Sequence, residues 1–201
     1  MPYLDYSHVL PRVDPLVPAR RKALSGFNQN KTPDGPFVGA YGELIAEIYL
    51  NDMVKAGNLK SCRYTGGGLG PDFELVTTKN KTVSIDVKTK RRSVVPFAGA
   101  EMSVPAYLSE SPGYVDPDLF LCISLRPYAR EVGEFTQAWV VGFIAGNKFR
   151  KKCNRVKEGA RVGGRNGVIG RMPCDVFNVK FRELTLPSNQ MSLFRVDAGE
   201  V

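Results

Sequence analysis

Apolar residues recur at helical spacing in one segment near the start of the chain, residues 38–56. Gly57 follows this segment directly and is a typical helix stop. The pattern therefore predicts a helix over residues 38–56. The apolar positions that share one helix face are Tyr41, Leu44, Ile45, Ile48 and Tyr49.

Shorter apolar or alternating runs follow this helix and predict strands. Residues 72–77 and 82–89 form a predicted hairpin, because turn-prone residues 78–81 separate two alternating runs. The run at 138–144 is continuously apolar, as expected of a strand buried on both faces. One early helix followed by several strands predicts a mixed α/β or α+β fold. Further strands are predicted at 61–65 and 118–125, with a final strand or strand pair at 175–186.

The 201 residues fit one domain, and the N-terminal part differs from the rest. Residues 1–36 contain six of the 14 prolines, which remove backbone donors and fix φ. We therefore expect an irregular proline-rich arm over residues 1–36 and a single domain over residues 37–201. The arm carries a small basic cluster, Arg20, Arg21 and Lys22.

The formal net charge of +8 is concentrated in one segment. Residues 148–171 contain nine basic residues, opposed within the segment by Glu158 alone, and five glycines. We therefore expect a flexible basic loop here, suited to contact with a polyanion. A solvated loop kept basic for solubility is the alternative, and charge alone does not separate DNA, RNA and an acidic membrane.

Composition excludes several classes of protein. A hydrophobic fraction of 43% and a charged fraction of 24% exclude a disordered chain, a collagen-like chain and a coiled coil. No apolar run approaches the roughly 18 residues of a membrane helix, and residues 1–10 lack the apolar block of a signal peptide. We expect a cytoplasmic protein without membrane contact, whose four widely spaced cysteines are free thiols.

The predicted hairpin brings chemically active side chains together. Strand alternation places Asp86 and Lys88 on one face of the second strand. The register that buries the apolar faces pairs Phe73 with Ile85 and Leu75 with Val83, and it puts Asp72 opposite Asp86. Two carboxylates so placed repel each other unless a cation lies between them, and a hard divalent ion with oxygen ligands suits that position.

A third carboxylate is available on the predicted helix. Glu43 and Glu47 lie four residues apart and share one helix face. A plainer interpretation makes Asp72 a turn residue before a strand, with Asp86 and Lys88 forming an ion pair on a solvated face.

Pro71-Asp72, followed after 14 residues by Asp86-Val87-Lys88, resembles the motif of the PD-(D/E)XK nuclease superfamily, also called restriction-endonuclease-like. The segment 39–46 resembles the helix that supplies an additional acidic residue in that superfamily. Glu43 directly follows Gly42, as in the family's helix, and is therefore preferred over Glu47. The resemblance covers residues 38–90 by motif, extends more loosely through 118–144, and favours a small phage-type member.

The resemblance implies an α/β fold with a restriction-endonuclease-like core, that is, a central mixed β-sheet flanked by helices. It implies Mg²⁺ or Mn²⁺ held by Asp72, Asp86, Glu43 and the Val87 carbonyl. Lys88 would be the catalytic lysine that assists the water nucleophile. The implied reaction is hydrolysis of DNA phosphodiester bonds by an endonuclease, leaving a 5′-phosphate, in a bacterium or a phage-infected host cell.

Basic residues near the implied cleft are candidates for contact with the nucleic-acid backbone, which they would grip without reading sequence. They are Lys90, Arg91 and Arg92, with Lys148, Arg150, Lys151, Lys152 and Arg155 in the basic segment and the cluster Arg20–Lys22. Two alternatives stay open: an RNA endonuclease with the same metal chemistry, and a non-catalytic nucleic-acid-binding protein on the same scaffold. The sequence also leaves open whether the chain forms a homodimer.

Overall fold

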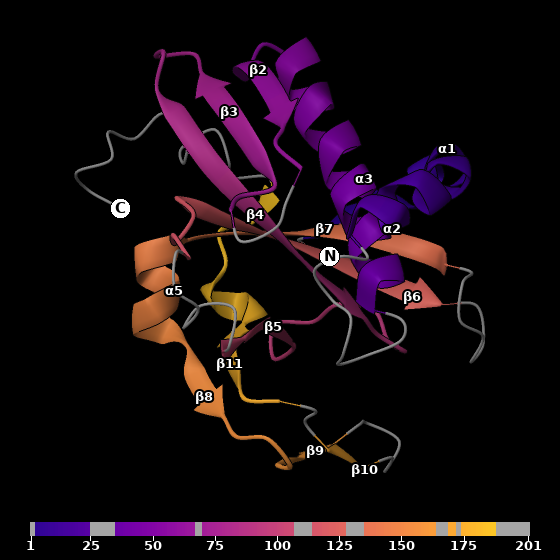
Figure 1. The fold of residues 1–201 in the computed structure, drawn as a ribbon, viewed down its shortest axis with the longest axis vertical. Coiled ribbons are helices and arrows are strands. Elements are labelled where there is room, and N and C mark those ends of the chain that lie inside the picture. The colour runs from indigo at the N-terminus through magenta and orange to yellow at the C-terminus, as the bar shows by residue number, and fades with distance from the viewer. Residues whose placement is uncertain are drawn as a thin grey trace.

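A six-stranded mixed β-sheet organises the chain in the computed structural model (Figure 1). The structure describes residues 3–24, 35–66, 70–106, 114–127, 135–163, 169–171 and 174–187. The strand order is β1-β7-β6-β4-β3-β2; β4 and β6 run parallel, and the other four neighbouring pairs are antiparallel. The strands are β1 (Leu4–Asp5), β2 (Leu59–Tyr64), β3 (Phe73–Thr77), β4 (Thr82–Arg91), β6 (Leu119–Pro127) and β7 (Phe135–Ala145).

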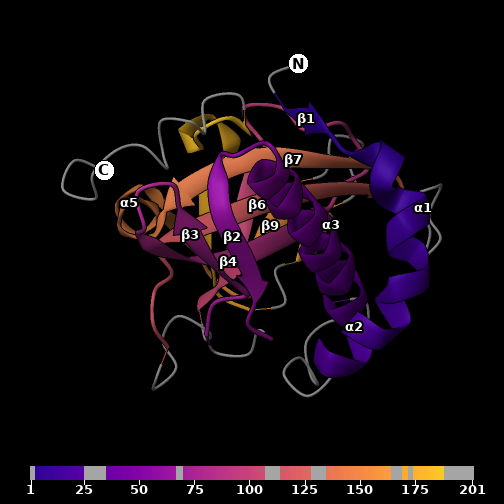
Figure 2. The same cartoon turned by 90° about the horizontal axis from the view of Figure 1, so that it is seen from above.

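Helices cover one face of this sheet. The long helix α3 (Gly35–Lys55) crosses β2, β4 and β6, and the short helices α1 (Leu10–Val13) and α2 (Val17–Leu24) lie beside it (Figure 2). Short 3₁₀ turns at Ser7–Val9 and Asp14–Leu16 precede α1 and α2.

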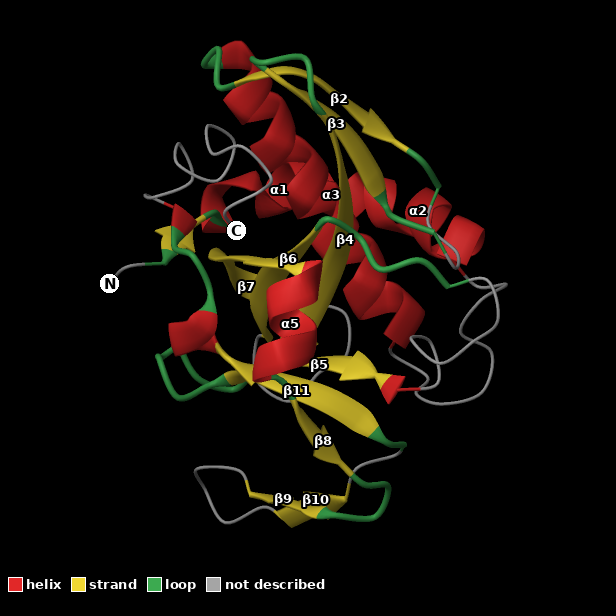
Figure 3. Cartoon of the chain, turned by 90° about the vertical axis from the view of Figure 1, so that its left-hand side faces the viewer, coloured by secondary structure: helices red, strands yellow, loops and turns green. Residues whose placement is uncertain are grey.

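The opposite face is covered by a second, three-stranded sheet in the order β5-β11-β8 and by helix α5 (Gly146–Lys152) (Figure 3). Its strands are β5 (Glu101–Pro105), β8 (Asn154–Val156) and β11 (Val176–Lys180), and a 3₁₀ turn at Phe181–Glu183 follows. The pair β9 (Arg161–Gly163) and β10 (Ile169–Arg171) forms a separate antiparallel ribbon.

Two hydrophobic cores lie on the two sides of the main sheet. Successive residues of β6 alternate between them: Leu121 and Ile123 pack with α3, whereas Phe120 and Cys122 pack with β5, β11 and α5. The strand β7 is buried on both faces in the same way, with Val140 in the first core and Trp139 in the second. The mixed α/β sheet flanked by helices is therefore observed.

Most elements predicted from periodicity are confirmed. The expected helix at 38–56 is α3, which begins three residues earlier, and the strands expected at 61–65, 72–77, 82–89, 118–125 and 138–144 are β2, β3, β4, β6 and β7. The run at 175–186 contains one strand, β11, followed by the 3₁₀ turn. The strand β5 and the helix α5 were not predicted, because neither is long enough to show a clear period.

The expectation of an irregular arm is wrong for residues 3–24, which form the short strand β1 and then a series of helical turns. Pro11 and Pro15 each lie in the first turn of a helix, where the missing N–H costs no hydrogen bond, and Pro18 is the second residue of α2. Apolar residues of this part, including Val9 and Val13, are fully buried in the core under α3. Residues 25–34 lie outside the described part.

The expectation of a flexible basic loop at 148–171 is also wrong where the structure describes it. The segment contains most of α5 and then β8, β9 and β10. Acidic residues distant in sequence pair with its basic side chains: Arg150 lies 2.9 Å from Asp116, and Arg155 lies 2.9 Å from Asp175. The local excess of positive charge is therefore partly compensated in the folded chain.

All four cysteines are free thiols, as expected. Within the described residues, no helix is both long and apolar enough to cross a membrane.

Candidate active site

The β3–β4 hairpin has the predicted register. Phe73 pairs with Ile85 and Leu75 pairs with Val83, so the apolar side chains of both strands face α3. The ladder ends at Phe73, and Asp72 lies one residue beyond it, where its N–H donates to the Ile85 carbonyl at 2.8 Å. The hairpin thus carries Asp72 to the level of Asp86 on β4, although the expected Asp72–Asp86 pair lies beyond the end of the ladder.

Asp72 is buried at 8% exposure, and its carboxylate has one backbone donor. Its Oδ2 accepts a hydrogen bond of 2.7 Å from the Val87 N–H. Burial raises the pKa of Asp72 well above its ordinary value, and the negative charges of Asp86 and Glu43 add to this rise. Lys88 and the Val87 N–H offset it only in part, so Asp72 is a carboxyl group that a nearby cation would keep ionised.

Asp86 and Lys88 form a close ion pair on the same face of β4. The Lys88 Nζ donates to the Asp86 carboxylate at 2.7 Å, and the two side chains are 17% and 10% exposed. Burial alone would lower the pKa of Lys88, but the charges of Asp86 and Asp72 outweigh burial and raise it. Lys88 is therefore a firmly protonated ammonium group beside two carboxylates. The pair is sheltered from solvent, unlike the solvated ion pair of the plainer interpretation.

Gly42 allows α3 to approach β4 closely and so brings Glu43 toward this strand. A Cβ built on Gly42 would lie 1.6 Å from Thr89 Oγ1 of β4, so no larger residue fits between helix and strand without displacement. Glu43, the next residue, is buried at 6% exposure. The Gly42-Glu43 pair noted in the sequence thus has a steric basis.

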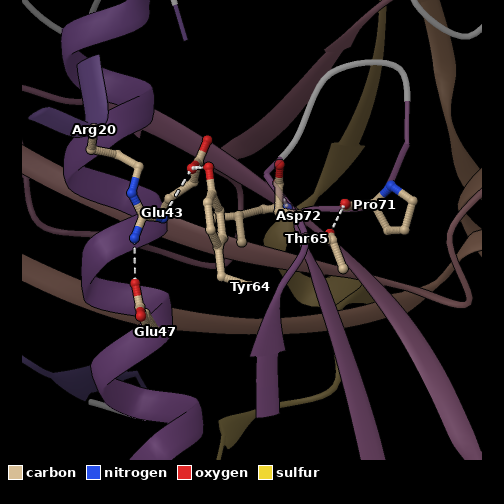
Figure 4. A network of polar contacts seen from close by, with 8 residues as sticks. Arg20, Glu43, Glu47, Tyr64, Thr65, Pro71 and Asp72 are labelled. Carbon is tan, nitrogen blue, oxygen red and sulfur yellow. Dashed lines mark hydrogen bonds and ion pairs between the residues drawn. The ribbon is translucent and has the colours of Figure 1, made fainter. Parts of the chain in front are cut away.

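Glu43 is held by residues of two other elements (Figure 4). Its Oε2 accepts a hydrogen bond of 2.8 Å from the Tyr64 hydroxyl and one of 3.3 Å from Arg20 of α2. Burial raises the pKa of Glu43, and these two donors oppose that rise. Arg20 also pairs with Glu47, whose side chain is 35% exposed compared with 7% for Glu43.

Pairing of β2 with β3 positions Tyr64. Tyr64 is the partner of Phe73 in the ladder, and the next residue, Thr65, donates its N–H to the Asp72 carbonyl at 2.9 Å. The Thr65 hydroxyl also donates to the Pro71 carbonyl (Figure 4). Tyr64 was not among the predicted site residues, and Arg20 was expected at the nucleic-acid surface. A tyrosine at the end of a strand that pairs with the Pro-Asp strand is the signal that was available.

The donor set fits a divalent metal ion in its chemistry. Asp72, Asp86 and Glu43 offer hard oxygen ligands that are buried, and Asp86 lies near enough to raise the pKa of both Asp72 and Glu43. In the part of the chain that the structure describes, no three such side chains are gathered as an ion would require. Glu43 instead faces Arg20, and Asp86 faces Lys88. The carbonyl of Val87 was the expected ligand, whereas the contact observed at Val87 is the hydrogen bond from its N–H to Asp72.

The basic residues that follow Lys88 on β4 differ in their surroundings. The Lys90 Nζ donates to Ser103 Oγ at 2.7 Å, and burial together with Arg92 lowers the pKa of Lys90 to about 8. Arg92 lies over the Phe181 ring at 4.6 Å and donates to the Glu101 carbonyl. Arg91 is exposed. The Arg92 side chain thus packs against other residues of the chain. Lys90 lies two residues after Lys88 on the same face of β4.

Among the other predicted contacts to nucleic acid, Lys148 and Lys151 are exposed on α5. Lys152 lies 3.5 Å from Glu183, and Arg150 and Arg155 form the ion pairs with Asp116 and Asp175 described above.

The sequence matches no family model, and it matches no curated protein.

Proposed function

We propose that the chain is a metal-dependent nuclease of the PD-(D/E)XK type, with a restriction-endonuclease-like core, and that it hydrolyses DNA phosphodiester bonds as an endonuclease. One observation carries the proposal: Asp72, Asp86 and Glu43 are all buried, Asp86 raises the pKa of both other carboxyl groups, and the Lys88 Nζ lies 2.7 Å from Asp86. Carboxylates concentrated in this way are costly without a cation, and a nuclease needs such a cation for its chemistry.

The residues of the site would have different roles in the reaction. Asp72, Asp86 and Glu43 would hold Mg²⁺ or Mn²⁺, together with the Val87 carbonyl. When bound, such an ion activates a coordinated water and polarises the scissile phosphate. Lys88 acts as a cation rather than as a base, because its raised pKa keeps the ammonium group protonated at neutral pH. It orients the nucleophilic water and stabilises the negative charge that develops on the phosphate.

A cleavage assay on metal-stripped protein tests the proposal. Circular single-stranded DNA, circular duplex, linear duplex and RNA of the same sequence are incubated with EDTA, Mg²⁺ or Mn²⁺. We expect cutting of circular DNA that requires the metal, and a loss of about 10²–10³-fold in Lys88→Ala. Lys81→Ala, which removes an exposed lysine from the turn of the same hairpin, is the matched control and should cut normally. Full activity in a folded Lys88→Ala protein would refute the role of Lys88, and cutting of RNA alone would make the protein a ribonuclease.

The close pairing of Lys88 with Asp86 favours a second candidate, a non-catalytic nucleic-acid-binding protein. In that case the ion pair is structural, and the exposed lysines of α5 provide the contacts. This candidate predicts binding that weakens steeply with salt and ignores Mg²⁺, without cutting of any substrate in the same assay.

A further inference from the structure

Arg20 lies inside the candidate site rather than on the nucleic-acid surface. Its side chain is 13% exposed, and its guanidinium lies 3.8 Å from the centre of the Tyr64 ring. One terminal nitrogen, Nη1, donates to Glu43, and the other, Nη2, donates to Glu47 (Figure 4). Helix α2 therefore contributes a rigid, forked cation that spans one turn of α3.

The contacts on Glu43 are one-sided. Arg20 and Tyr64 both donate to Oε2, and no described residue donates to Oε1. A carboxylate held through one oxygen has its plane fixed while its second oxygen stays available to a ligand. Groups that donate hydrogen bonds to one oxygen of a metal-binding carboxylate orient the carboxylate and keep it ionised.

The charges in the site support this interpretation. Asp72, Asp86, Glu43 and Glu47 carry four negative charges when ionised, and Lys88 and Arg20 carry two positive charges. Two negative charges remain, and one divalent cation would neutralise them. Without Arg20, Glu43 would lose the cation that opposes the effect of burial on its pKa.

We propose that Arg20 is a positioning residue that, with Tyr64, holds Glu43 through Oε2 so that Oε1 can take part in binding Mg²⁺ or Mn²⁺. This inference rests on the proposed metal-dependent nuclease. It gives the N-terminal helical segment, which the sequence pattern did not connect to the site, a part in metal binding that acts through Glu43.

The experiment measures Mn²⁺ binding without nucleic acid, by electron paramagnetic resonance of the free ion, and then the Mg²⁺ concentration that gives half-maximal DNA cleavage. Arg20→Ala removes the fork. Tyr64→Phe removes one donor to Oε2 but keeps the ring beneath the guanidinium, so it is the variant less prone to unfold. Arg12→Ala removes an exposed arginine of α1 and serves as the matched control. Circular dichroism checks the folding of each protein.

We expect the Mn²⁺ dissociation constant to rise about 10–100-fold in Arg20→Ala, by a smaller factor in Tyr64→Phe, and not at all in Arg12→Ala. Cleavage by the two site variants should recover when Mg²⁺ is raised, which a merely structural defect would not allow. An unchanged or lower dissociation constant in both variants would overturn the inference and leave the nuclease in place. Wild-type protein that binds no Mn²⁺ would refute the nuclease itself, and the inference with it.

Discussion

The contact between α3 and β4 makes Gly42→Ala a sharp test of how the site is built. The added Cβ would lie 1.6 Å from Thr89 Oγ1, 2.7 Å from Thr89 Cβ and 2.8 Å from Thr89 Cγ2. These distances are well below van der Waals contact, so helix and strand must separate or the Thr89 side chain must move. Glu43 is the neighbouring residue and would move with the helix.

The magnitude follows from two opposed effects. Overpacking in a core costs about 1–3 kcal/mol, and contact with an atom as close as Thr89 Cβ places this case near the upper end. Alanine is a better helix former than glycine by about 1 kcal/mol, which offsets part of that cost. We therefore expect a net loss of about 2 kcal/mol, or about 4–8 °C in melting temperature for a chain of this size.

Thermal and urea unfolding followed by circular dichroism measure this loss. Thr89→Ala removes the two outer atoms of the clash and leaves the Cβ contact, so the double variant should recover part of the stability. Gly70→Ala is the control, because a Cβ there meets nothing within 4 Å and the expected change is within about 0.5 kcal/mol. A Gly42→Ala protein as stable as wild type, with no coupling to Thr89, would show that the helix does not approach β4 this closely.

Two further predictions concern basic residues outside the carboxylate cluster. The pKa of Lys90 is lowered to about 8, so the folded chain releases this proton at lower pH than the unfolded chain, whose lysines have pKa values near 10.5. The unfolding free energy of wild type relative to Lys90→Met should therefore rise from about pH 8 to about pH 10 in urea titrations, and parallel curves would contradict the burial of Lys90. Lys151→Ala should weaken DNA binding and reduce the slope of log affinity against log salt by about 1, measured by fluorescence anisotropy. Arg150→Ala should do less, because that guanidinium is paired with Asp116; equal effects would refute this distinction.

Much of the main sheet was predictable from local patterns. The alternation in β3 and β4 was sufficient to set their register, because a shift of one residue would turn every apolar side chain to the wrong face. The continuous apolar run of β7 likewise predicted burial on both faces, and both cores bear this out. The N-terminal helices do not follow from the sequence pattern, because prolines predict breaks, whereas Pro11 and Pro15 lie in the first turns of helices.

The residues of the candidate site also differ in whether local patterns could place them. Asp72, Asp86 and Lys88 come from one hairpin, so short-range pairing brings them together and the sequence could place them. Arg20 and Tyr64 reach Glu43 from 23 and 21 residues away, through the packing of α2 on α3 and of α3 on the sheet. No local pattern encodes those contacts.

The sequence by itself determined the elements whose hydrophobic period is long enough to detect, and with them the hairpin that carries Asp72, Asp86 and Lys88. Only the tertiary structure decided which cation faces which carboxylate when the two come from distant segments. Arg20 pairs with Glu43 within the site. In the basic segment, Arg150 pairs with Asp116 and Arg155 pairs with Asp175. The physical reason is the distance along the chain between the residues that interact. Strand register follows from burying alternate residues of neighbouring strands, whereas an ion pair between distant segments exists only after the hydrophobic faces of helices and sheet have packed.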